Sequence, residues 1–272
     1  LYQEKISMMD LRSPNDRDRP IFLIIGAAFA AFFLMLGLVL FPIDARAGAL
    51  LFDLAGKLGV YPFTVQGLMW LVFFLALADA VYIYLVIGKD KAGLRAHLLP
   101  EEKTKMISNQ TARSLYSSIT NGLGKSSSVP FLILKTLDQF FISGSLSRAS
   151  DVFDNSVRLL SDRNDLRFSF IRYVAWLLPT IGFIGTVIGI SLALVVAAEP
   201  PMEMNSVSMR DWMSSLTGEL GYAFDTTLLA LAQSAVVVFI QSQVQAYAEQ
   251  TLVDCEEYCL DNLINKLLDP KG

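Results

Sequence analysis

The chain has 272 residues, of which 53% are hydrophobic; its mean hydropathy is +0.47 and its formal net charge is −4. A soluble domain of this length is rarely so apolar, and the composition therefore predicts a membrane protein. Two cysteines and a single histidine far from them are too few for a structural zinc site, so no metal is expected.

Four apolar windows have the length of a membrane-spanning helix, about 20 residues. None shows the apolar and polar alternation of a membrane barrel strand. We therefore expect an all-α membrane protein with four transmembrane helices, a large helical cytoplasmic insertion between helices 2 and 3, and a cytoplasmic C-terminal helix. The windows are Ile21 to Phe41, Gln66 to Ile87, Tyr173 to Ala197 and Tyr222 to Gln241.

The positions of Lys and Arg predict the orientation. Thirteen of the 22 lie in residues 88–172, and four lie in the first 20 residues. By the positive-inside rule, both termini and the long middle segment are cytoplasmic. The expected division is 1–20 cytoplasmic leader, 21–87 transmembrane helices 1 and 2 with their outer link, 88–172 cytoplasmic helical domain, 173–246 pore-lining transmembrane helices 3 and 4, and 247–272 cytoplasmic amphipathic tail.

The first half of the chain is expected mainly to anchor the protein in the membrane. Pro20 suits the first position of a helix, and the first apolar window is too long for a signal-peptide core. The outer link, Pro42 to Phe63, is expected to form a short helix or turn. Asp79 lies in the inner half of the second window, where a carboxylate is costly. This carboxylate predicts either an ion relay or, as we favour, a polar pin to a neighbouring helix or to the basic cytoplasmic edge.

The cytoplasmic segment is too long to lack structure of its own. Its pattern predicts helices near Pro100 to Ser118, near Pro130 to Ser143, and from Ser145 continuously into the third span, with Thr120 to Ser128 as a linker. Thirteen basic and eight acidic residues with few aromatics argue against a nucleic-acid partner. The amphipathic stem suggests docking of a cytoplasmic partner. His97 is expected to be a surface or interface histidine.

The third window carries three glycines, Gly182, Gly185 and Gly189, at helical spacing. This small face lets another backbone approach closely. Thr186 adds a hydroxyl that a simple anchor does not need, unless it only bonds back to a carbonyl one turn earlier in its own helix. Pro200-Pro201 is expected to end the helix.

The fourth window, beginning near Leu220, places Asp225 and a run of hydroxyl, amide and small residues in apolar surroundings. Such residues face a helix bundle or a watered path. Beyond Gln241 the helix is expected to continue as a tail used for helix pairing or subunit contact. Its apolar positions recur at four-residue steps: Tyr247, Thr251, Cys255, Cys259, Leu263 and Leu267. The two cysteines are expected to be packed free thiols.

The block from Pro179 to Ile190 resembles the glycine block of the MotA/TolQ/ExbB proton-channel family, in which a proline precedes a Gly-x-x-Gly-Thr-Val-x-Gly run. Ala223 to Leu228 resembles, more loosely, that family's last-helix signature. Together the two blocks cover less than a sixth of the chain. The large cytoplasmic insertion is similar to the MotA branch, whereas the helix signature is more similar to TolQ and ExbB.

The resemblance implies a multi-pass protein of the bacterial inner membrane, surrounded by lipid, that forms a homopentamer. Its last two spans would line a pore occupied by a dimer of a single-span MotB/ExbD/TolR-like partner with an ionisable aspartate. No cofactor is implied; the transported ion would be H⁺ or Na⁺. Carried over by motif, the pore threonines are Thr186 and Thr227. Neighbouring pore-lining positions are Tyr222, Asp225 and Thr226, and the helix-packing positions are Pro179, Gly182, Gly185 and Gly189.

Two positions depart from the family pattern. A glutamate usual in ExbB-type members is replaced by Tyr222, with Glu219 and Asp225 one turn to either side. The proline common near the inner half of the last span is replaced by Gln233-Ser234-Ala235. These departures bear on ion selectivity and gating more than on the fold.

The leading functional hypothesis is an ion-conducting, stator-like subunit, most simply a proton channel. The alternative is a non-conducting membrane scaffold that assembles through the glycine face and docks a partner. A membrane enzyme has little support, because the chain has no metal-ligand cluster, nucleophile elbow or phosphate-binding loop.

Overall fold

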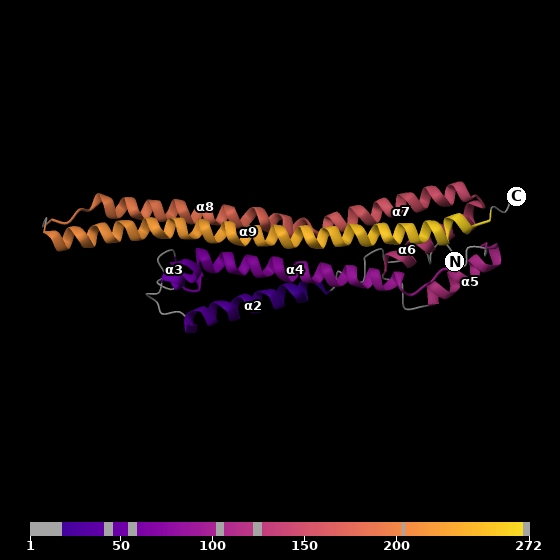
Figure 1. The fold of residues 1–272 in the computed structure, drawn as a ribbon, viewed down its shortest axis with the longest axis horizontal. Helices are drawn as coiled ribbons and strands as arrows, with labels where there is room; N and C mark the ends of the chain where they lie inside the picture. Colours follow the sequence, from indigo (N-terminus) through magenta and orange to yellow (C-terminus); the bar gives the residue numbers. More distant parts are fainter. Residues whose placement is uncertain are drawn as a thin grey trace. The chain divides into compact units, whose positions relative to one another are not determined.

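A computed structural model describes residues 18–40, 46–53, 59–101, 106–121, 127–202 and 205–268 (Figure 1). Apart from one short antiparallel hairpin, its elements are helices, as the sequence predicted. Most of the leader, 1–20, and most of the linker, Thr120 to Ser128, lie outside the described residues. The elements are α2 (Arg19–Leu40), α3 (Arg46–Phe52), β1 (Gly59–Val60), β2 (Phe63–Thr64), α4 (Val65–Leu94), α5 (Asn109–Asn121), α6 (Ser128–Ser143), α7 (Leu146–Arg167), α8 (Ser169–Ala198), α9 (Ser206–Asn262) and the 3₁₀ turn η2 (Ile264–Lys266).

Four helical stretches among the described residues are long and apolar enough to cross a membrane. They are Arg19–Leu40, Val65–Leu94, Leu146–Ala198 and Ser206–Lys266. The last three each contain one predicted window, and the first contains its window except for Phe41, which lies outside the described residues. Many of their large apolar side chains, above all those of Arg19–Leu40, are exposed on the single chain, as lipid-facing residues would be. The chain is therefore a multi-pass membrane protein.

The described residues form two compact units. We call residues 20–80 and 169–242 the apolar unit, and residues 18–19, 81–168 and 243–268 the polar unit. Helices α4 and α9 each contribute to both units, and the two units are described separately below.

In the apolar unit, α2 packs on α4 through a small contact and an aromatic cluster. Gly26 allows close approach, because an added Cβ would lie 2.7 Å from the Cβ of Ala78. Phe33 packs its ring 4.7 Å from that of Trp70 and 5.2 Å from that of Phe74. Side chains of α4 also bind the end of α3: Gln66 donates to the carbonyls of residues 49 and 50 at 3.1 Å each, and Trp70 donates to that of residue 51 at 2.7 Å.

The polar unit has a continuous apolar core made by α5, α6, α7 and the last turns of α9. The prediction for the tail holds in part, since its four-residue stripe is buried. It packs within its own chain: Thr251, Cys255, Cys259, Leu263 and Leu267 are each at most 5% exposed, and the last four belong to a cluster with Leu132, Leu137 and Phe153.

The predicted helix from Pro100 to Ser118 was placed too early, because α5 begins only at Asn109. The preceding segment pairs with the end of the chain: Ile107 N–H donates to the Lys266 carbonyl at 2.7 Å, and Leu268 N–H donates to the Ile107 carbonyl at 3.4 Å. These backbone groups serve an extended pairing and are not available to a helix. Ser108 then accepts from the N–H of Thr111 and starts α5.

The stem runs into the third span, as predicted: Leu146–Ala198 is one long helical stretch, with a one-residue turn at the buried Phe168 between α7 and α8. Arg19 donates to the Arg167 carbonyl beside this turn at 3.1 Å. Helix α9 begins at Ser206, well before Leu220. Asn205 caps it by accepting the N–H groups of Val207 and Ser208 at 3.1 and 2.8 Å, a capping signal that was readable in the sequence.

Candidate functional site

The glycine face of α8 packs directly against α9 in the apolar unit, and the two helices run side by side in Figure 1. Gly182, Gly185 and Gly189 are all buried. Opposite them α9 presents residues with no exposed surface. An added Cβ would lie 2.4 Å from Ala230 Cβ at Gly182, 2.6 Å from Thr226 Oγ1 at Gly185, and 2.9 Å from Ala223 Cα at Gly189. A side chain at any of the three would push the helices apart.

Close approach of the helices brings three hydroxyls together. Thr186 of α8 and Thr227 of α9 hydrogen-bond to each other through their Oγ1 atoms. Thr186 Oγ1 also lies within donating distance of the Ala223 carbonyl, at 2.9 Å, and Thr227 Oγ1 of the Gly182 carbonyl, at 3.2 Å. Each hydroxyl has one hydrogen, so it donates either to the other threonine or to a carbonyl. The result is a small polar cluster of neutral groups inside two apolar helices.

The threonines differ in burial. Thr186 and Thr227 are half-buried, so part of each side chain reaches the surface of the chain. Thr226 is fully buried and donates to the carbonyls of Ala223 and Gly182 at 2.9 and 3.4 Å. Its position is that of a packing residue between the helices.

The other predicted site residues differ in how deeply they are buried. Tyr222 and Asp225 are half-buried on α9, within one or two turns of the hydroxyl cluster. Asp79 of α4 is completely buried. His97 belongs to the polar unit. Its side chain is 69% exposed and its Nδ1 bonds to Glu101, as expected for a surface histidine.

Pro179 has a partner that sequence reasoning missed. A proline in a helix lacks the N–H that would bond to the carbonyl four residues earlier, here that of Ala175. Ser234 of α9 donates its Oγ to that carbonyl at 2.8 Å. The sequence showed both residues, but only the helix register brings them together.

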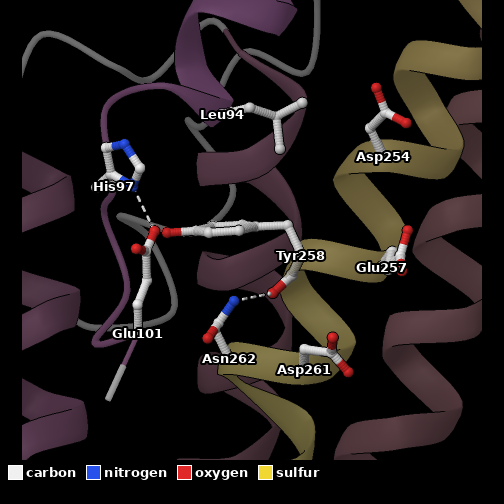
Figure 2. Close-up of a pocket in the computed structure, with 8 residues that line it drawn as sticks. All are labelled: Leu94, His97, Glu101, Asp254, Glu257, Tyr258, Asp261 and Asn262. Carbon is white, nitrogen blue, oxygen red and sulfur yellow. Dashed lines mark hydrogen bonds and ion pairs between the residues drawn. The ribbon is translucent and has the colours of Figure 1, made fainter. Parts of the chain in front are cut away.

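The polar unit has a hollow of about 350 Å³ where the end of α4 meets α9. Figure 2 shows Tyr258 extending from α9 toward the segment that carries His97 and Glu101. Its hydroxyl accepts the N–H of Leu99 at 3.0 Å, and burial raises its pKa. Carboxylates dominate the lining: Glu101, Asp254, Glu257 and Asp261. This charge disfavours anionic ligands such as nucleotides.

Metal chemistry and reactive thiols have no support in the part of the chain that the structure describes. No group of three His, Cys, Asp or Glu side chains there is placed to hold a metal ion. Cys255 and Cys259 are free and have no exposed surface, as expected. Burial raises the pKa of each to about 12, with a further contribution at Cys255 from Asp90 and Asp254, so both stay neutral thiols.

Comparison with known proteins gives a family match that covers both helices of the site. No curated protein and no solved structure matches the chain. A sequence model of the MotA/TolQ/ExbB proton channel family, a channel family rather than an enzyme family, matches residues 133–257. The matched range runs from α6 into the second half of α9 and includes the glycine face, Thr186 and Thr227. Residues 133–257 are therefore a domain of the MotA/TolQ/ExbB proton channel family.

Proposed function

We propose that the chain is the ion-conducting subunit of a bacterial inner-membrane motor, and that it uses the ion-motive force, most simply of protons, to drive rotation or force on a partner. The family domain at residues 133–257 supports a channel role of the motor-stator kind. The observation that carries the proposal is the bonded pair Thr186 and Thr227, held by the glycine face between the two helices of that domain.

The chemistry of the pair suits a proton pathway. A threonine hydroxyl donates and accepts hydrogen bonds without a fixed charge, so it can bind a hydrated proton or a carboxylic acid and release it again. A fixed charge in the same place would hold the ion too tightly. Because Thr186 and Thr227 are half-buried, a group outside the chain can reach them.

The proposed assembly follows the family. Five copies surround a dimer of a single-span MotB/ExbD/TolR-like protein, whose membrane aspartate passes the threonine pairs in turn. Tyr222 and Asp225 line the approach to each pair. Thr226 and the glycines hold the helices together, and Asp79 pins α4 within its own unit. Residues 88–172 and the tail are cytoplasmic and offer a surface for a cytoplasmic partner.

Proton flux into vesicles tests this function. The full chain is reconstituted with the single-span protein encoded beside it, and a pH-sensitive dye inside the vesicles reports flux. Thr186→Val and Thr227→Val should each reduce flux at least tenfold, because valine keeps the shape but removes the hydroxyl. Assembly should survive, since an interhelical hydrogen bond in a membrane contributes only about 0.6 kcal/mol on average.

Thr180→Val is the matched control. Its hydroxyl donates to the Trp176 carbonyl of its own helix at 3.0 Å and contributes nothing across to α9. Flux should therefore remain near that of the unmodified protein. Normal flux in both Thr186→Val and Thr227→Val would overturn the pore assignment.

A non-conducting scaffold is the second candidate, and one observation favours it. Thr186 and Thr227 already lie within donating distance of carbonyls of their own chain, as hydroxyls that merely join two helices would. Under this alternative the assembled complex binds its partner but passes no protons, and the two valine variants weaken only the assembly.

A further inference from the structure

One polar side chain in the apolar unit has no use in the site described above. Gln233 lies in the predicted fourth span and is only 4% exposed. Neither its Oε1 nor its Nε2 has a hydrogen-bond partner among the residues that the structure describes. A buried amide without partners is strongly unfavourable, above all inside a membrane. Its neighbour Ser234 does have a hydrogen-bond acceptor, the carbonyl of Ala175.

The position of Gln233 relates it to the threonine cluster. It follows Thr226 by seven residues, which is close to two turns of α9 and about 10 Å along the axis on the same face. Ala230, which lies between them on this face, is fully buried and packs against Gly182, and Gln233 lies about one turn beyond that contact. In the predicted topology this direction runs from the threonines toward the cytoplasm.

We propose that Gln233 binds water and forms the cytoplasmic half of the proton route that begins at Thr186 and Thr227. The inference rests on the proposed function. Its Nε2–H donates to a water oxygen, and its Oε1 accepts from a water hydrogen. The amide itself neither takes up nor releases a proton; the proton moves along the hydrogen-bonded water. Polar groups of membrane helices face the bundle interior or a water-filled cavity, and a buried water bonds to polar groups that the protein leaves unpaired.

Hydrogen exchange of the side-chain amide tests the water directly. The full chain, labelled with ¹⁵N-glutamine and reconstituted in lipid, is transferred to D₂O and followed by solid-state NMR. The signal of Gln233 is the one missing from Gln233→Met. We expect it to disappear at least tenfold faster than that of Gln66, which is also buried but donates to two carbonyls. Equal protection of the two amides would overturn the proposal.

Proton flux supplies the second measurement. Gln233→Met keeps the volume but removes the hydrogen-bonding groups, and we expect at least a tenfold loss of flux without a rise in Tm. Gln243→Met, the same change at an exposed position of α9, should leave flux unchanged. If Gln233→Met instead conducts normally and raises Tm, the amide is a dry, unsatisfied group and the proposal fails.

These results separate the inference from the proposed function. Loss of flux in Thr186→Val with normal flux in Gln233→Met rejects only the role of Gln233. Normal flux in Thr186→Val rejects the proposed pore, while the exchange measurement still decides whether Gln233 is hydrated.

Discussion

Ser234 of α9 donates its hydroxyl to the carbonyl oxygen that Pro179 of α8 leaves without a helical partner, that of Ala175, at 2.8 Å. Proline is tolerated in membrane helices where a neighbouring helix supplies such a donor. The hydrogen bond therefore joins the proline of the glycine block to a serine at the place in the last span where this chain departs from the family pattern.

A double-mutant cycle tests this link. Ser234→Ala should lower stability by about 1 kcal/mol, because it leaves a carbonyl unsatisfied in an apolar environment. In a Pro179→Ala background the backbone N–H of residue 179 can serve that carbonyl, so the same change should have a smaller effect. Thermal unfolding of the purified protein, followed by intrinsic fluorescence, measures both. Equal losses in the two backgrounds would show that Pro179 and Ser234 act independently.

We expect a single methyl group added to the glycine face to lower the stability of the protein. Gly189→Ala places a Cβ 2.9 Å from Ala223 Cα and 3.0 Å from its backbone nitrogen, neither of which can turn aside. Overpacking of this kind destabilises by about 1 to 3 kcal/mol. Gly221→Ala on α9 meets nothing within 4 Å and should be neutral or slightly stabilising, because alanine favours a helix. The Tm and the yield of monodisperse protein compare the pair. A normal Tm for Gly189→Ala would mean that α8 and α9 do not pack as described.

We expect the two buried thiols to resist labelling by thiol reagents over a wide pH range. With the pKa of Cys255 and Cys259 raised to about 12, the reactive thiolate is scarce in the folded protein even at pH 9. A maleimide should label neither cysteine until the protein is unfolded, which mass spectrometry of the intact chain will show. Rapid labelling of the folded chain at pH 8 would contradict the burial of the tail.

The sign of the linked stability effect follows from the same shift. In the folded chain both thiols hold their protons more tightly than in the unfolded chain. Their contribution is therefore fully present below the unfolded pKa, near 9, and is lost as pH rises toward 12. A Cys255→Ala/Cys259→Ala variant should lose less stability than the unmodified protein over this interval. An identical pH dependence in both would mean that the thiols ionise equally well in the two states.

The four apolar helices can be predicted from the sequence alone, as can the buried stripe of the tail and the family of the region around Pro179. These rest on composition and local periodicity, which the chain carries residue by residue. One boundary depended on partners far along the chain. The start of α5 was misplaced because Ile107 pairs with Lys266 and Leu268, and no local pattern announces such a pairing.

The candidate site shows the same division. Its residue types could be read from the sequence, since glycines and hydroxyls in apolar windows are unusual. Their pairing could not: only the register of α8 against α9 brings Thr186 to Thr227, buries Thr226 beneath Gly185, and places Ser234 on Ala175. It also leaves Gln233 buried without a partner among the described residues. Side-chain contacts between helices depend on rotation and offset, which the tertiary packing decides and a single helix does not encode.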